Sequence, residues 1–257
     1  MNNKVDYLVL GSGLSSLSFS ALMAQKKSVK ILECHEHFGG YGHTFAVGDY
    51  RFNSQLHYVP SCGKSGIVYT LLSRLGLEKD VTFNLLNSQG YDRVYCGDKQ
   101  LHIPYGYENL QKNMKQICPQ AGNEIQKFIQ ILMTFEKAAN NFPLHFHQSY
   151  KIIKALPSYI KLFKYRNATL QDIFDECHLP KILQTLVAGQ LIDYMLPPKE
   201  LSFFVWAALF NAYNAGAYYP TKHFENVVDS LVKSIQDHGG ELCSNEREID
   251  FITEGKT

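Results

Sequence analysis

Near its N-terminus the chain has an apolar–polar pattern typical of two strands joined by a helix. Residues Val5–Leu10 form a short apolar run, which favours a buried parallel strand. From Leu14 to Gln25 the apolar residues recur at helical spacing, and Val29–Leu32 is a second apolar run. A strand, a helix and a strand in so short a segment predict a βαβ unit and hence a parallel sheet.

The pattern changes after about residue 65. Two strand-like stretches flank Gly97-Asp98, a pair typical of a hairpin turn. The chain is mainly helical after that, with prolines between the helices. The predicted strands are Tyr91–Cys96 and Gln100–Pro104, and the predicted helices are Tyr107–Ile117, Glu124–Asn140, Leu170–Cys177, Lys181–Tyr194 and Lys199–Tyr213.

An α/β rhythm returns near the C-terminus. Residues Gly216–Tyr219 are expected to be extended, Phe224–His238 to be helical, and Glu241–Cys243 and Ile249–Ile252 to be strands. The expected fold is a discontinuous, Rossmann-like α/β domain (residues 1–64 and 214–257) with an inserted, mainly helical α+β domain (residues 65–213). The last turn of the chain ought to lead into another strand, so the sheet is expected to be incomplete.

Composition narrows the class of protein only a little. The net charge is +1, which gives no bulk electrostatic reason to expect nucleic acid as a partner. Hydrophobic residues make up 45% of the chain, enough for a sizeable core. Aromatic residues make up 13%, which fits either core packing or a pocket for a large apolar ligand.

Cysteine and histidine usage favours a reduced, cytoplasmic compartment without disulfides or a metal site. The six cysteines form no C-x-x-C motif, and the N-terminus has no signal-peptide pattern. No apolar run reaches the ~18–20 residues that span a bilayer. Several histidines lie close in sequence, but no cysteine or carboxylate completes a zinc-ligand spacing. These histidines are His35, His37, His43, His145 and His147.

The turn after the first strand contains most of a phosphate-binding motif. Gly11 and Gly13 match the first two glycines of G-x-G-x-x-G, and Ser16 replaces the third. Gly11 permits a tight turn, and Gly13 lets a pyrophosphate approach the N-terminus of the next helix. Glu33 ends the second strand, where a carboxylate can bind the hydroxyls of an adenosine ribose. The alternatives are a loop that binds nothing and a surface acid at a strand end.

A pair of glycines, Gly39-Gly40, follows Glu33 after five residues. Two glycines let the backbone pass close to a pyrophosphate from its other side, which a NAD-binding unit does not need. The spacing E-x5-G-G, then GGYGHTF and YRFNSQLHYV, resembles the retinol saturase and carotenoid isomerase-like branch of the flavin amine oxidase and phytoene desaturase superfamily. The stretch GAYYPTKHFENVVDSLVKSIQDHGGEL also resembles the segment that returns the chain to the FAD domain in that family.

This resemblance implies FAD as the cofactor and assigns roles to individual residues. Gly11, Gly13, Leu14 and Ser15 would hold the pyrophosphate, Glu33 the ribose, and Gly39, Gly40, His43 and Thr44 the cofactor toward the flavin. His57 and Tyr58 would lie on the catalytic side near the isoalloxazine, and the backbone of Ile249 would receive the adenine. The chain departs from the family at Ser16, at Asn53 in place of Asp and at Gln55 in place of Gly.

Members of this family are about twice as long as this chain, and their C-terminal half contains a second flavin contact. The sequence is therefore expected to be an N-terminal fragment, or its remainder to be a separate chain. On this interpretation the partner of the chain is the missing C-terminal half.

The resemblance implies an FAD-dependent oxidoreductase acting on C–C bonds of an apolar isoprenoid, carotenoid or retinoid by desaturation, saturation or isomerisation. One alternative is a non-catalytic protein like a GDP-dissociation inhibitor, which holds a prenyl group. A NAD-dependent dehydrogenase fits the βαβ unit but does not explain Gly39-Gly40.

A basic, amphipathic stretch lies within the predicted inserted domain. Residues 149–167 contain four lysines, an arginine and no acid, with apolar residues between them. Such a stretch fits a helix lying in a membrane interface, which would make the protein peripherally membrane-bound. The alternative is a solvated helix that covers a core.

Overall fold

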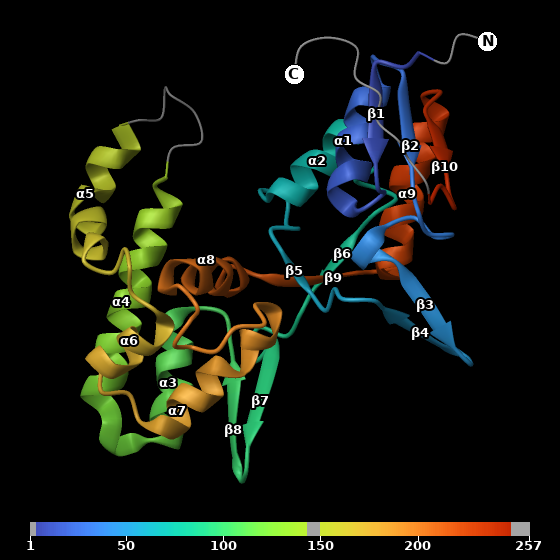
Figure 1. Ribbon diagram of the computed structural model, residues 1–257. Coiled ribbons are helices and arrows are strands. Elements are labelled where there is room, and N and C mark those ends of the chain that lie inside the picture. Colours follow the sequence, from blue (N-terminus) through green and yellow to red (C-terminus); the bar gives the residue numbers. More distant parts are fainter. Residues whose placement is uncertain (1–3, 143–149, 248–257) are drawn as a thin grey trace. The chain divides into compact units, whose positions relative to one another are not determined.

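The computed structural model describes residues 4–142 and 150–247 and divides into two compact units (Figure 1). Unit 1 comprises residues 1–84 and 218–257, and unit 2 comprises residues 85–217. The chain leaves unit 1 through β6 (Phe83–Leu85) and returns through β9 (Ala217–Pro220). These two strands form a sheet with β5 (Val59–Pro60), in the order β5-β9-β6.

Unit 1 contains a parallel sheet in the order β1-β2-β10. Its strands are β1 (Tyr7–Leu10), β2 (Val29–Leu32) and β10 (Glu241–Cys243). Three helices contribute to its core, namely α1 (Leu14–Ala24), α2 (Ile67–Leu75) and α9 (His223–Asp237). Leu17 and Ala21 of α1 pack there with Ile31 of β2 and Val228 of α9. This arrangement is the Rossmann-like α/β class that the hydrophobic pattern predicts.

The sheet of unit 1 is incomplete, as the sequence predicts. Leu8 and Leu10 of β1 alternate with the core-facing positions and are 51% and 43% exposed. Within the described residues, β1 pairs with β2 and has no neighbour at its other edge. Parallel sheets normally have both faces covered, so this face and edge lack part of the usual cover.

A short 3-10 turn at Gly40–Gly42 leads from the sheet into the antiparallel hairpin of β3 (Thr44–Val47) and β4 (Tyr50–Asn53). The sequence analysis does not predict this hairpin. Its side chains are mostly exposed on both faces, so the short Tyr-Arg-Phe-Asn alternation of β4 does not mark a buried face.

Unit 2 combines the predicted hairpin with a set of helices. The hairpin consists of β7 (Asp92–Cys96) and β8 (Lys99–Ile103). The helices are α3 (Tyr107–Ile117), α4 (Gly122–Asn140), α5 (Tyr150–Phe163), α6 (Leu170–Glu176), α7 (Lys181–Val187) and α8 (Phe203–Asn214), with 3-10 turns at Pro119–Ala121 and Ala188–Asp193. Trp206 stacks on Phe210 with ring centroids 4.6 Å apart, beside Phe128 and Phe203. Many aromatic residues of this unit therefore build its core.

The limits of the two units differ from the predicted domain limits of 64/65 and 213/214. Residues 65–84 belong to unit 1, because Leu72 and Leu75 of α2 enter its core. The return to unit 1 follows Ala217. The helix predicted over Lys181–Tyr194 ends at Val187 and continues as a 3-10 turn. The strand predicted at Ile249–Ile252 lies outside the described residues.

Candidate cofactor-binding site

The loop between β1 and α1 contains two glycines, and the backbone conformation favours glycine at only one of them. Gly11 has φ +81°, a left-handed conformation that favours glycine, and its N–H donates to the Leu32 carbonyl at 2.8 Å. Gly13 has φ −58° and precedes the first turn of α1. A Cβ added at Gly13 would meet no atom within 4 Å, so neither backbone conformation nor packing within the chain requires glycine there.

Glu33 is directed back toward this loop from the end of β2. Its Oε2 accepts hydrogen bonds from the Ser12 N–H at 2.7 Å and the Ser12 hydroxyl at 2.6 Å. Its Oε1 accepts from the His35 N–H at 2.9 Å and the Cys34 thiol at 3.4 Å. The side chain is buried, with the residue only 5% exposed, and it ties the loop to the strand end.

Opposing effects determine the ionisation of Glu33. Burial acts to raise the pKa of its carboxyl group, whereas hydrogen bonds from Ser12 and His35 lower it, and they prevail with a pKa of about 2. Glu33 is therefore a carboxylate at neutral pH. An anion held at this position suits a ligand that offers hydroxyl donors.

Gly39 and Gly40 cross directly over the β1–α1 loop. The Gly39 N–H donates to the Ser12 carbonyl at 3.0 Å, and Gly39 forms an isolated parallel bridge with Gly13. A Cβ on Gly40, which has φ +54°, would lie 3.1 Å from the Gly13 Cα. A Cβ on Gly39 would lie 2.8 Å from a methyl group of Val228. The glycine pair is thus needed for the close contact of two backbone segments.

A cavity of about 450 Å³ lies beside this crossing. It brings together three residues of the predicted site, Gly13, Gly40 and His43. The remaining lining residues are His35, Glu36, His37, Tyr41 and Ser54. The first turn of α1 contains no acidic residue and no side-chain cap, so its positive end can accept an anion.

His43 and Thr44 lie between the glycine pair and α9. His43 Nδ1 is 2.6 Å from the Gly40 carbonyl oxygen, and Thr44 Oγ1 is 3.2 Å from His223 Nδ1. Both residues line a second cavity of about 240 Å³, together with Val228 and Asp229. The two cavities share Glu36, His37 and His43.

The other predicted residues lie in different surroundings. Leu14 packs close to Gly42, and Ser15 is exposed in the first turn of α1. His57 is exposed and Tyr58 is half-buried in the segment between β4 and β5. Neither of these two lines the cavities described above. Ile249 lies outside the described residues.

The hydrogen bonds of Asn53 explain why an amide fits at this position, where the family that the sequence resembles usually has Asp. Its Nδ2 donates to the Tyr219 hydroxyl at 2.7 Å and to the Leu56 carbonyl at 3.2 Å. Its Oδ1 accepts from the Thr44 hydroxyl at 3.3 Å. An ionised carboxylate could not donate the first two bonds.

Ser12 is the main residue of this site that the sequence analysis missed. It occupies the variable position between Gly11 and Gly13 and is completely buried. Its hydroxyl donates to Glu33 and also accepts from the Gly39 N–H at 3.2 Å. The only sequence signal is a small hydroxyl residue between the two glycines.

The side chains of Glu33, Cys34 and His35 bring their ligand atoms within 4.8 Å of one another. Both oxygens of Glu33 already accept hydrogen bonds, one of them from the Cys34 thiol. Internal hydrogen bonding therefore accounts for the proximity of Glu33 and Cys34, and His35 adds its backbone N–H to the same carboxylate. Of the histidines considered in the sequence, His145 and His147 lie outside the described residues.

Comparisons with known proteins agree with a Rossmann-like fold for this part of the chain. Residues 9–75 match a family model described as "NAD(P)-binding Rossmann-like domain". The chain is 23% identical over 254 residues to "All-trans-retinol 13,14-reductase" from Rattus norvegicus, covering 94% of this chain and 41% of that protein. It is 22% identical over 268 residues to "Carotenoid 3,4-desaturase" from Haloarcula japonica, covering 98% and 51%.

A solved oxidoreductase from Methanosarcina mazei superimposes with a TM-score of 0.62 at 15% identity, covering 93% of this chain and 51% of that chain. These matches confirm the Rossmann-like fold and the resemblance to the phytoene desaturase and retinol saturase-like branch. The chain spans about two fifths of the length of the retinol reductases that it matches.

Proposed function

We propose that unit 1 binds FAD and that the protein is an FAD-dependent oxidoreductase acting on C–C bonds of an apolar isoprenoid substrate. The observation that carries this proposal is Gly13. Neither its φ angle nor its packing calls for glycine, and a Cβ there would project into open space beside a cavity. A glycine that the fold does not need fits a position where a ligand phosphate approaches the backbone.

The residues around the cavity match the parts of a dinucleotide. The pyrophosphate would lie at the positive N-terminus of α1, against the backbone of Gly11, Gly13, Leu14 and Ser15. Gly39, Gly40, His43 and Thr44 would line the cofactor toward the flavin. The fold keeps Gly40 next to Gly13, so one ligand could contact both segments. When bound, the flavin supplies the redox chemistry, and the chain supplies position and an apolar environment.

Glu33 would bind the adenosine ribose only after an exchange of hydrogen bonds. Its two oxygens accept four donors, so ribose hydroxyls would have to replace the weakest or most mobile of them. The Cys34 thiol, at 3.4 Å the longest of the four contacts, is the donor that a ribose hydroxyl would replace most easily. The backbone donors of Ser12 and His35 would keep the carboxylate in place.

The substrate class follows from the relatives. The rat protein is named as a retinol reductase and the haloarchaeal protein as a carotenoid desaturase, and both names describe redox changes in conjugated isoprenoids. We propose that His57 and Tyr58 lie on the side of the flavin that faces the substrate.

Flavin binding by purified protein tests the proposal directly. We expect the full chain to bind FAD in a fluorescence titration, and Gly13→Ala to weaken binding at least tenfold. Gly13→Ala should change the free energy of unfolding by less than about 1 kcal/mol, because its Cβ meets no atom. Gly122→Ala is the matched control, since a Cβ at this helical glycine also meets nothing within 4 Å.

Three results would contradict the proposal. Equal FAD affinity of Gly13→Ala and wild type would show that Gly13 does not contribute to FAD binding. Binding of NADH but not FAD would favour the dehydrogenase. Binding of a prenylated peptide by protein that takes up no FAD would favour the prenyl-binding alternative.

A further inference from the structure

Helix α5 has an apolar face that the described part of unit 2 leaves uncovered. Five apolar residues of this helix are exposed, with Ile153 at 74% and Ile160 at 66%. The others are Ile152, Leu156 and Phe163. At the ~100° per residue of an α-helix, these five positions fall within an arc of about 100° on one side. The exposed residues thus form one continuous stripe along the helix.

The opposite side of α5 is anchored, which fixes the direction of this stripe. Ala155, Ser158 and Leu162 are buried. The Tyr159 hydroxyl donates to the Ala138 carbonyl of α4 at 3.0 Å. Because the buried side is held against its own unit, the apolar stripe is a defined surface.

Basic residues follow the stripe on one side of the helix. By the same helical spacing Lys164 lies about 20° beyond the edge of the stripe, and Lys161 and Lys154 lie about 80° and 100° beyond it. Arg166 follows the end of the helix. The helix contains no acidic residue. Lys164 pairs with Glu176 at 2.8 Å, whereas Lys154 and Lys161 have no acidic partner among the described residues. This side of the helix has a net positive charge.

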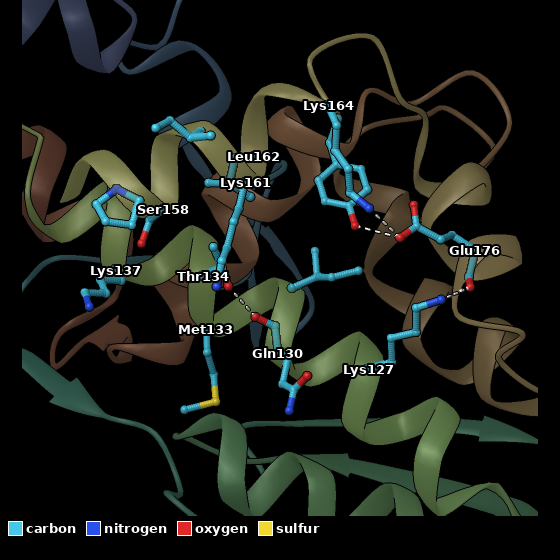
Figure 2. Close-up of a pocket in the computed structure, with 14 residues that line it drawn as sticks. Lys127, Gln130, Met133, Thr134, Lys137, Ser158, Lys161, Leu162, Lys164 and Glu176 are labelled. Carbon is cyan, nitrogen blue, oxygen red and sulfur yellow. Dashed lines mark hydrogen bonds and ion pairs between the residues drawn. The ribbon is translucent and has the colours of Figure 1, made fainter.

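A groove between α4 and α5 adjoins the stripe and extends the positive side (Figure 2). Its volume is about 970 Å³, and its lining includes Ile160 of the stripe and Lys161 of the positive side. Lys127 and Lys137 of α4 line it too. Lys127 donates to the Glu176 backbone carbonyl, and the Glu176 side chain also lines the groove, so four lysines face one acid there. Figure 2 shows Lys161 of α5 and Thr134 of α4 among the side chains that line the groove.

We propose that α5 docks on the surface of an anionic lipid bilayer. Its apolar stripe enters the boundary between headgroups and acyl chains, and its lysines contact the lipid phosphates. An apolar stripe followed by cations on one side, with no acid on the helix, complements an anionic interface. The docking does not depend on flavin binding, which we propose for unit 1.

Vesicle co-sedimentation of the full chain tests this proposal. We expect binding to phosphatidylcholine vesicles that contain phosphatidylserine, and much weaker binding to pure phosphatidylcholine vesicles. The double change Ile153→Ser and Ile160→Ser should weaken binding at least tenfold. Lys154→Glu with Lys161→Glu should also weaken binding at least tenfold. A high salt concentration should weaken the binding of wild type, because it screens the attraction between the lysines and the lipid phosphates. Lys164 is left unchanged because reversing its charge would place an acid beside Glu176.

Matched controls lie in the same unit. Lys112→Glu with Lys115→Glu makes the same charge change on the exposed side of α3, and Val205→Ser removes an exposed apolar residue of α8. Both should sediment as wild type does. The conservative change Phe163→Trp adds a second probe that keeps the stripe apolar, and its emission should shift to the blue with the anionic vesicles.

Several outcomes would overturn the proposal. These are an absence of sedimentation by wild type, equal sedimentation of the α5 variants and their controls, and an unshifted Phe163→Trp emission. Self-association that the isoleucine changes abolish, without lipid binding, would identify a second copy of the chain as the occupant. Failure of FAD binding would leave these measurements unaffected, so the two proposals can fail separately.

Discussion

Ser12 and Glu33 form a two-point contact that joins the β1–α1 loop to the end of β2. The Ser12 N–H and hydroxyl donate to the same carboxylate oxygen, at 2.7 and 2.6 Å. The Ser12 hydroxyl also accepts from Gly39, so one buried side chain connects three segments. The geometry of the candidate cofactor site therefore depends on a residue in the variable position of the glycine motif.

Ser12→Ala should lower the free energy of unfolding by about 1–3 kcal/mol. The change removes a charge-assisted hydrogen bond and leaves the Gly39 N–H with one acceptor fewer. Urea denaturation followed by far-UV circular dichroism measures this loss. Ser73→Ala on the exposed side of α2 is the control and should change stability by less than about 0.5 kcal/mol. Equal stability of the two variants would show that the Ser12 contact is energetically unimportant.

Stability should fall in acid because of Glu33. Its folded pKa of about 2 lies below its ordinary value of 4.5, so the stabilisation is complete above pH 4.5 and is lost as the pH falls toward 2. The full contribution is on the order of 3 kcal/mol. Urea denaturation of wild type and Glu33→Gln at several pH values between 7 and 3 measures it.

The Glu33→Gln variant should be less stable at neutral pH and should show a smaller loss between pH 4.5 and 3. Glu200→Gln, at an exposed position, should keep the wild-type pH profile. Parallel pH profiles for wild type and Glu33→Gln would assign the acid sensitivity to other groups.

Elements with a clear apolar period and a glycine or proline at their ends could be predicted from sequence. The bounds of β2, α3 and β10 agree with the prediction, whereas α1 differs from it by one residue at its C-terminal end and α9 by one residue at each end. The buried positions of β2, α1, α3 and α9 recur at the period of the element, which is the signal that a hydrophobic pattern carries. The β3–β4 hairpin has no such signal because both its faces are mostly exposed.

The candidate site was predictable only in part. The positions of Gly11, Gly13 and Glu33 follow from a motif whose spacing is set by local geometry. The role of Ser12 depends on where the second strand ends in space, and the contact of Gly40 with Gly13 depends on a crossing of distant segments. Pairings of this kind have no local sequence pattern.

Gly40→Ala should destabilise the protein more than Gly97→Ala does. Both glycines have positive φ, +54° and +59°, so alanine costs about 1–2 kcal/mol at either position. Only at Gly40 would the added Cβ press on another backbone, 3.1 Å from the Gly13 Cα, whereas at Gly97 it meets nothing within 4 Å. The difference between the two unfolding free energies, measured in urea, isolates this contact. A difference of zero would mean that the two loops can separate without cost.

Phe128→Ala should destabilise unit 2 by about 3–5 kcal/mol, because it leaves a cavity among fully buried aromatic rings. Phe128 lies 5.8 Å from Phe174 and 6.2 Å from Trp206, measured between ring centroids. Trp206 is the only tryptophan of the chain, so its fluorescence reports the unfolding of this core. Phe142→Ala is the matched control, since Phe142 is 63% exposed and its removal should cost less than about 0.5 kcal/mol. If both variants unfold at the same urea concentration as wild type, the aromatic cluster is not the core that stabilises unit 2.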